Sequence, residues 1–291
     1  MHQNFTFNVN RYNYHCCQSG SGSPVVLAHC SGSNHKQWKI LTTQLQHQYK
    51  VLAPDFLGYG NSDSFNGWAS HDAPDATALE QLISKQSEPV HLIGHSYGGA
   101  MALMATLNIP YKIRSLTLIE PVTFNVLRET YDWQQRHQIC SVADRIISLT
   151  QRQQNKQAAC EFVQYWHSRI AWWLMPKALK TRLQKAMPKI AAEFHLMYTH
   201  YASSEALQTL KMPVHLLCGS KTTEEAKAVV HALDELIPDT HLSVLTNCGH
   251  LAAATHPQKV NPAILHWLQS LQSIDAGTNT ANLTVNYCAT S

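Results

Sequence analysis

The sequence predicts an α/β fold with a mostly parallel central sheet, helices on both of its faces, and one inserted helical region. Short apolar segments rich in β-branched residues alternate with helical segments, which is typical of consecutive βαβ units. Residues 123–211 show no strand-like alternation and have a helical pattern instead. The 291 residues, 44% hydrophobic and 14% charged, are enough for one large domain plus an inserted subdomain.

Taken in order, the segments predict an opening antiparallel pair of strands and then a parallel series. Strands are expected at Phe5–Asn10, Tyr12–Gln18, Pro24–Cys30, Lys50–Asp55, Val90–Ile93, Ile113–Val122, Pro213–Ser220 and the segment HLSVLT. Helices are expected around Trp38–Leu45, at Asp75–Lys85, Ala100–Leu107, Thr222–Leu236 and Pro257–Leu271. The core then comprises residues 1–122 and 212–273, the insertion residues 123–211, and a flexible polar tail residues 274–291.

Composition and charge exclude several classes of protein. The net charge of +3 is too small to indicate nucleic-acid binding, and no apolar run approaches the roughly 18 residues of a membrane span. No basic segment followed by an apolar core opens the chain, so a cytoplasmic protein is expected. The eight cysteines lack CxxC spacing and are expected to be reduced.

The charge is unevenly distributed along the chain. Residues 123–211 hold 12 Lys and Arg against 6 Asp and Glu, a net of +6, while the remainder holds 10 against 13, a net of −3. A solvated basic surface and steering of an anionic substrate both fit this pattern.

The stretch VHLIGHSYGGAMAL contains the strongest candidate for a catalytic residue. A β-favouring run stops at Gly94, and a helix-forming series follows GHSYGG. Gly94 and Gly98 flank Ser96 at the spacing GxSxG, where residues without side chains allow a strained, tight turn. The helix that starts there directs unpaired N–H groups at the place where an oxyanion would form. Ser96 is therefore predicted to be a nucleophile, the alternative being a plain glycine turn.

This strand, turn and helix resemble the nucleophile elbow of the α/β-hydrolase family. The resemblance extends from Pro24 to about Ser273, and the loop after Lys50–Asp55, with the string DxxGxGxSD, agrees with it. It implies a catalytic serine, acid and histidine in that chain order, together with N–H donors for an oxyanion hole. Asp55 and Asp63 are expected to brace loops and have no catalytic role.

Two places in the chain could supply the acid. Glu120 lies at the carboxyl end of the strand next to the nucleophile strand, at the sheet edge where open α/β sheets bind ligands. The later loop, where many family members carry an Asp, has Lys221, Thr222 and Thr223. Glu224 and Glu225 follow in the first turn of an expected helix, where carboxylates commonly only face the helix dipole. Glu120 is the preferred acid, with Glu224 or Glu225 as the alternative.

The histidine and the oxyanion donors follow from the same resemblance. His250 lies in the loop after the last strand, the family's place for its base, whereas His256 begins the next helix and is the weaker candidate. The loop after Pro24–Cys30 matches the family's oxyanion loop, which makes the backbone N–H groups of Ser31 and Tyr97 the donors. Cys30 stands there where glycine is usual, and a nucleophilic role for Cys30 is an open alternative.

Together these residues predict a serine hydrolase that acts on a small carboxylic ester through a Ser-His-Glu triad and an acyl-enzyme. No cofactor and no metal are expected. Hydrolysis of a carbon-carbon bond, a thioester or a lactone, and a non-catalytic binding role, are the alternatives. The partner is a small-molecule substrate, with no nucleic acid and no membrane, and the oligomeric state is open.

The insertion at residues 123–211 resembles the helical lid of the family. Its aromatic residues could form its own core, walls for the substrate, or both. Pro176 and Pro188 are expected to break its helices.

Overall fold

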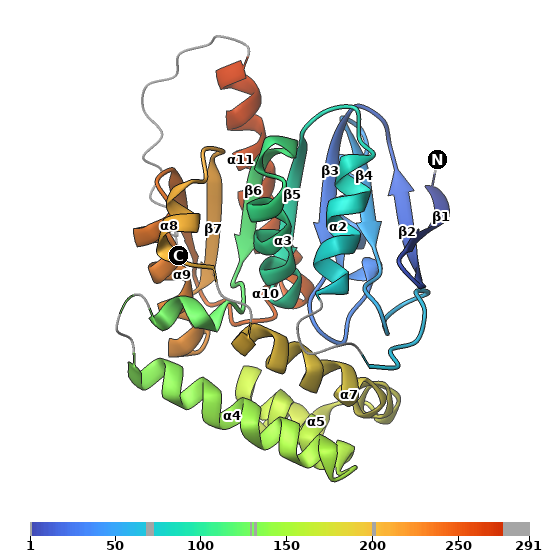
Figure 1. Cartoon of the computed structure of the whole chain (residues 1–291), viewed down its shortest axis with the longest axis vertical. Helices are drawn as coiled ribbons and strands as arrows, with labels where there is room; N and C mark the ends of the chain where they lie inside the picture. The colour runs from blue at the N-terminus through green and yellow to red at the C-terminus, as the bar shows by residue number, and fades with distance from the viewer. Residues whose placement is uncertain (1, 68–72, 129, 131–132, 200–201, 276–291) are drawn as a thin grey trace.

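The computed structural model describes residues 2–67, 73–128, 130, 133–199 and 202–275 (Figure 1). Its described strands form one eight-stranded sheet in the order β1-β2-β4-β3-β5-β6-β7-β8. The strands are β1 His2–Val9, β2 Tyr12–Ser19, β3 Ser23–Ala28, β4 Tyr49–Pro54, β5 Val90–His95, β6 Ile113–Ile119, β7 Val214–Gly219 and β8 Thr240–Leu245. The pairs β1/β2 and β2/β4 are antiparallel and all others are parallel. The predicted opening pair and the mostly parallel sheet are confirmed.

Helices cover both faces of the sheet. The helices of the core are α1 Lys39–Leu45, preceded by the 3₁₀ turn η1 His35–Trp38, α2 Pro74–Ser84, α3 Tyr97–Asn108, η2 Pro110–Lys112, α9 Glu224–Leu236, α10 Ala252–Thr255 and α11 Pro257–Asp275. Helices α2, α3 and α9 contribute to one buried apolar cluster, and α1, α10 and α11 contribute to another. The predicted α/β layers are therefore confirmed.

Alternation along the central strands explains why there are two cores. In β3, Val25 and Leu27 belong to one cluster, whereas Val26 and Ala28 belong to the other. Successive side chains of a strand point to opposite faces, so a strand covered on both faces is mostly apolar. This is why apolar residues predominate in the central strands, with buried polar exceptions such as His91 and Ser115, which bond to each other.

The segment between β6 and β7 is helical, as its sequence predicts. It comprises η3 Phe124–Arg128, α4 Trp133–Gln151, α5 Asn155–Trp166, α6 Arg169–Leu174, α7 Lys177–Thr199 and α8 Ser204–Gln208. Figure 1 shows α4, α5 and α7 gathered beyond one end of the sheet. These three helices lie apart from the layers that flank the sheet, whereas α8 packs against α9 of the core. The whole segment from η3 to α8 is here called the helical insertion.

Several predicted boundaries are corrected. Strand β6 ends at Ile119 and not at Val122, because Glu120 adopts a positive φ of 43° that an extended strand cannot continue through. Pro176 does precede a helix, but Pro188 lies inside α7 without ending it. A proline removes one helical hydrogen bond, and burial of Met187 and Ile190 beside it keeps the helix in place.

The C-terminal boundary also differs from the expected one. Helix α11 runs to Asp275, beyond the predicted end of the core at residue 273. The predicted flexible tail lies, from residue 276 on, outside the described residues. None of the helices in the described part of the chain is long and apolar enough to cross a membrane.

Candidate active site

Ser96 lies in the turn between β5 and α3 with a strained backbone. Its φ of 55° and ψ of −118° fall outside the regions that non-glycine residues favour. A side chain on Gly98 would meet the carbonyl oxygens of Ala28 and His29, and one on Gly94 would meet the backbone of Gly98. The turn therefore requires glycine at both flanking positions, which holds the Ser96 side chain at the carboxyl edge of the sheet.

The structure brings Ser96, His250 and Glu120 together in one hydrogen-bonded chain. The Ser96 Oγ lies 2.9 Å from Nε2 of His250, and Nδ1 of His250 lies 2.8 Å from Oε2 of Glu120. The three side chains are buried. With Nδ1–H donating to the carboxylate, Nε2 is left to accept the Ser96 hydroxyl proton. This is the arrangement of a nucleophile, a base and a group that orients the base.

Glu120 is held as a carboxylate by three donors. Besides His250, Thr222 Oγ1 donates to Oε2 at 2.6 Å and the Gly219 N–H donates to Oε1 at 2.7 Å. Burial opposes ionisation of Glu120. The hydrogen bond and charge of His250, together with the hydrogen bonds from Thr222 and Gly219, nevertheless hold the pKa of Glu120 below its usual value. The carboxylate is thus available to stabilise an imidazolium at position 250.

The alternative acids and the weaker histidine make other contacts. Glu224 pairs with Lys227 at 2.7 Å, and Glu225 accepts a hydrogen bond from Tyr165. His256 bonds to the neighbouring Thr255. Only Glu120 among the three candidate carboxylates is bonded to His250, so geometry favours it.

The loop after β3 is positioned by residues that the sequence did not single out. The Cys30 N–H donates to Gln37 Oε1, the Gln37 amide donates to His95 Nδ1, and His95 Nε2 donates to the His250 carbonyl oxygen at 2.8 Å. Burial lowers the pKa of His95 to about 4, so this imidazole is neutral and can fill both roles. The chain of bonds links the predicted oxyanion loop to the loop of the candidate base. Sequence alone held no signal for it.

The predicted oxyanion donors remain unpaired. Within the described residues, no acceptor faces the backbone N–H of Ser31 or of Tyr97, the first residue of α3. Both residues line the same cavity as Ser96. Cys30 is buried, and burial raises the pKa of its thiol to about 12, which makes it a poor nucleophile. All seven cysteines in the described part of the chain are free thiols.

The helical insertion covers Ser96. The Trp166 ring of α5 stacks on the His250 imidazole with 3.6 Å between ring centroids and 17° between planes. The cavity at Ser96 holds only about 20 Å³, enough for one or two water molecules. A larger cavity of about 930 Å³, beside α2 and α3, contains none of the candidate catalytic residues. Cavity volume therefore does not identify the candidate site, whereas the hydrogen-bonded side chains at Ser96 do.

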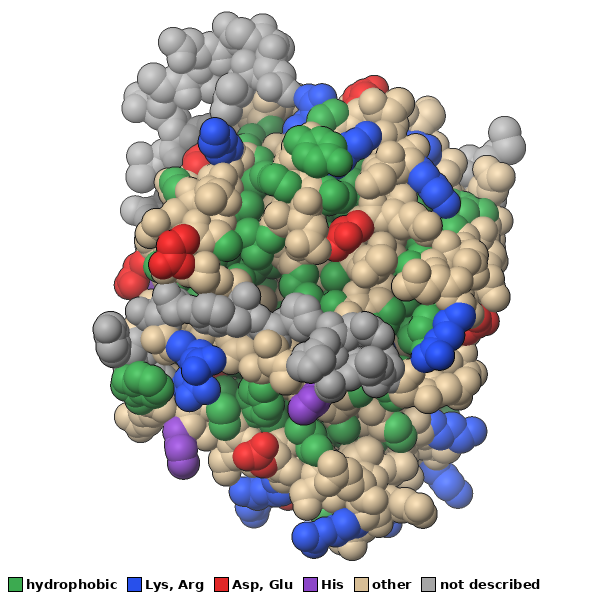
Figure 2. All heavy atoms as spheres, viewed as in Figure 1, with side chains coloured by type: hydrophobic (Ala, Val, Ile, Leu, Met, Phe, Trp, Pro, Cys, Tyr) green, Lys and Arg blue, Asp and Glu red, His purple; other side chains and the backbone are tan. Residues whose placement is uncertain are grey.

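Figure 2 shows several Lys and Arg side chains on the surface of the helical insertion.

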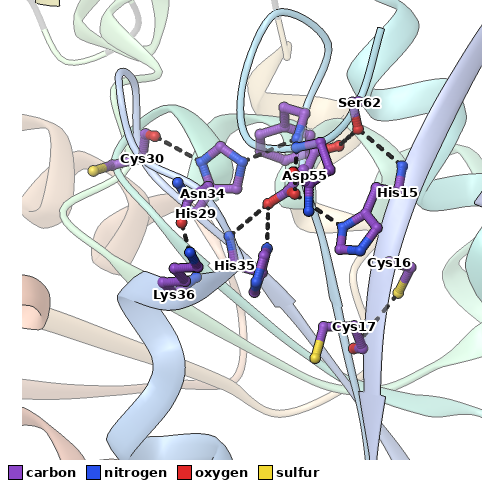
Figure 3. A network of polar contacts seen from close by, with 12 residues as sticks. His15, Cys16, Cys17, His29, Cys30, Asn34, His35, Lys36, Asp55 and Ser62 are labelled. Atoms are coloured by element: carbon purple, nitrogen blue, oxygen red, sulfur yellow. Dashed lines mark hydrogen bonds and ion pairs between the residues drawn. The ribbon is translucent and has the colours of Figure 1, made fainter. Parts of the chain in front are cut away.

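Asp55 is the centre of a second polar network next to the predicted oxyanion loop (Figure 3). Its carboxylate accepts from the His35 N–H, His35 Nδ1, the Asn61 N–H and His15 Nδ1 at 2.7 to 2.9 Å. Among the described residues, these two histidines and Asp55 are the group that could hold a metal ion. Four donors already occupy both carboxylate oxygens, so the group fits a loop brace better than a metal site. Asp63 similarly accepts from the Asn13 backbone.

Residues 25–263 match the model of the family described as "Alpha/beta hydrolase family". The chain is 33% identical over 113 residues to a 2-hydroxy-6-oxo-2,4-heptadienoate hydrolase of Pseudomonas putida, covering 35% of this chain and 39% of that protein. It is 24% identical over 240 residues to a pimeloyl-[acyl-carrier protein] methyl ester esterase of Aeromonas salmonicida, covering 82% and 93%.

A solved structure shares the fold. A thermophilic esterase from Thermogutta terrifontis superimposes with a TM-score of 0.70 at 22% identity, covering 92% of this chain and 99% of that one. At that identity the likeness extends to the arrangement of the elements only.

Proposed function

The chain belongs to the α/β-hydrolase family, and from that premise we propose that it is a serine hydrolase of small carboxylic esters. The observation that carries the proposal is the chain of contacts from Ser96 Oγ through His250 to Glu120, at 2.9 and 2.8 Å. Hydrogen-bond reach between nucleophile, base and orienting acid is the requirement for an activated serine.

The reaction would begin with transfer of the Ser96 proton to His250 Nε2 as Ser96 Oγ attacks the ester carbonyl carbon. Glu120 would hold the imidazole in the tautomer with a proton on Nδ1 and stabilise the imidazolium. The N–H groups of Ser31 and Tyr97 would bind the developing oxyanion, aided by the N-terminus of α3. Since these donors have no other partners, they need no rearrangement at the moment of reaction.

His250 would then protonate the leaving alcohol, which leaves an acyl-enzyme on Ser96. Water, activated by His250, would release the acid and restore the serine. No cofactor takes part in either half of this reaction. Because the cavity of about 20 Å³ is smaller than any ester, the helical insertion must move before substrate enters. We therefore assign it the role of a lid that closes over Ser96 and selects the substrate.

Replacement of Ser96 by Ala tests the proposal. We expect hydrolysis of 4-nitrophenyl butyrate by the folded variant to fall by about 10⁴ or more. Undiminished turnover by a folded Ser96→Ala protein would end the proposal.

A fluorophosphonate probe separates the enzyme from a binding module of the same fold. The probe should label the wild-type chain and leave Ser96→Ala unlabelled, because labelling needs an activated serine. A wild-type chain that resists labelling would favour the binding role.

The relative from Pseudomonas putida supports a second candidate, hydrolysis of a carbon-carbon bond by the same triad. Assay of 2-hydroxy-6-oxo-2,4-heptadienoate beside methyl and thioester substrates of matched size would rank the reactions by kcat/KM. The basic insertion, with 12 Lys and Arg against 6 Asp and Glu, would steer anionic members of such a panel.

A further inference from the structure

Glu193 of α7 is one of the residues that line the cavity at Ser96. The residue is 3% exposed, and it lines the cavity together with Ser31, Ser96 and Tyr97. The remaining lining is apolar and comprises Val122, Phe124, Phe162, Trp166, Ile190, Phe194 and Met197. Glu193 takes no part in the proposed triad, so its presence in this apolar surrounding requires another explanation.

The two oxygens of Glu193 have unequal environments. Tyr59 OH donates to Oε1 at 2.8 Å, and Lys189 Nζ lies 3.5 Å from the same oxygen. Oε2 is fully buried and has no hydrogen-bond partner. The Ser31 hydroxyl is near the carboxyl group without bonding to Oε2. A buried polar atom without a partner is rare in a native protein and marks a place where a partner is expected.

The charged and titratable groups around Glu193 come from five segments of the chain. Lys189, one turn earlier on α7, donates to Asp75 of α2 at 2.6 Å. Tyr59 follows β4, Tyr97 begins α3, and the Cys30 thiol follows β3. Burial raises the pKa of Glu193 to about 7, against the opposing effects of Lys189 and the Ser31 and Tyr59 hydroxyls. Near neutral pH both the acid and the carboxylate are populated.

We propose that Glu193 Oε2 forms a polar subsite that selects substrates with a hydroxyl group close to the reacting ester. A hydroxyl both donates and accepts, so it pairs with Oε2 whether Glu193 is ionised or protonated. An ammonium group fits only the carboxylate, and an ether oxygen fits only the acid. The inference rests on the proposed function, since it concerns the substrate of the same serine.

The unsubstituted ester of the same size is the competitor that the subsite rejects. On entry it leaves Oε2 buried without a partner, whereas the hydroxylated ester supplies one. Sites that hydrogen-bond a substrate hydroxyl discriminate strongly for this reason. We expect kcat/KM for the preferred hydroxy ester to exceed that of its deoxy counterpart by about ten- to a hundred-fold.

The experiment compares matched esters on the full-length wild-type chain. Methyl butyrate is set against methyl 2-hydroxybutyrate, methyl 3-hydroxybutyrate and methyl 3-methoxybutyrate, and propyl butyrate against 2-hydroxyethyl butyrate. Released acid is followed by pH-stat. The panel places the hydroxyl on the acyl or the alcohol side, and the methoxy ester distinguishes acceptance from donation.

Variants then assign the preference to Glu193. Glu193→Leu should reduce the ratio of hydroxy to deoxy kcat/KM to about one, whereas Glu193→Gln, whose amide both donates and accepts, should keep most of it. Tyr59→Phe is the matched control, because it removes the partner of Oε1 and leaves Oε2. A readout that needs no variant is the methoxy ester, whose kcat/KM relative to methyl butyrate should fall as pH rises through 7.

Two results would overturn the subsite. The wild-type chain could hydrolyse all esters with ratios near one, or Glu193→Leu could keep the preference; in the second case, loss of the preference in Ser31→Ala would assign it to the Ser31 hydroxyl. Each leaves the proposed ester hydrolysis intact. Failure to hydrolyse any ester in the panel would instead refute the proposed function itself.

Discussion

Replacement of Glu120 by Gln tests which group orients His250. In the wild type, Oε1 accepts from the Gly219 N–H at 2.7 Å and Oε2 accepts from His250 Nδ1 at 2.8 Å. A glutamine has one oxygen and one NH₂ group for these two positions. If the oxygen remains on Gly219, the NH₂ group donates to Nδ1 and forces the proton onto Nε2, so His250 cannot accept the Ser96 proton.

The opposite orientation of the amide is also unfavourable. The amide oxygen would then accept from His250 Nδ1, but the NH₂ group would face the Gly219 N–H. Two donors would then oppose each other in a buried site, which is unfavourable. In either orientation the negative charge that stabilises the imidazolium is lost. We expect kcat to fall by about 10² to 10⁴, or about 3 to 5 kcal/mol of barrier.

The assay is steady-state hydrolysis of 4-nitrophenyl butyrate, with circular dichroism and thermal melting to establish that the variant is folded. Glu224→Gln and Glu225→Gln are the matched controls and should retain wild-type kcat, because their carboxylates bond to Lys227 and Tyr165. A folded Glu120→Gln protein with at least half of the wild-type kcat, or a large loss in Glu225→Gln, would refute this reasoning.

Trp166→Ala should raise kcat/KM for octanoate esters relative to butyrate esters, because it removes the ring stacked on His250. It should also lower the free energy of unfolding by about 3 to 5 kcal/mol. An unchanged dependence of kcat/KM on acyl chain length would contradict the first expectation. Lys189→Met should lower the free energy of unfolding in urea by about 3 to 5 kcal/mol, because it leaves the buried Asp75 carboxylate without its cation. Adding Asp75→Asn should recover part of that loss, and equal stability of the single and double variants would count against the ion pair. Burial opposes ionisation of Asp55, but the bonds and charge of His35 and the Asn61 N–H lower its pKa from 3.8 to about 2. Because the pKa of Asp55 is lower in the folded than in the unfolded protein, its ionisation stabilises the fold by about 2 kcal/mol above pH 4, and this contribution is lost as pH falls toward 2. Asp55→Asn should remove that acid dependence from the free energy of unfolding measured over a pH series.

The sequence by itself determined the features that depend on local pattern. Apolar runs separated by helical segments predicted the parallel sheet, because a strand covered on both faces is mostly apolar. Gly94 and Gly98 predicted the turn at Ser96, since only glycine fits the backbone contacts there. The end of a strand beside β5 placed Glu120 at the correct edge of the sheet, and the loop after β8 did the same for His250.

Only the tertiary structure decided what faces these residues. Helical periodicity in residues 123–211 indicated which positions are buried but not what they pack against, and so it could not bring Trp166 onto His250 or Glu193 into the cavity at Ser96. The bonds from Cys30 through Gln37 and His95 to His250 join the segment after β3, the end of β5 and the loop after β8, which are distant in sequence. Helix α7 likewise continues through Pro188 because tertiary packing outweighs one lost hydrogen bond, and a local rule cannot weigh that packing.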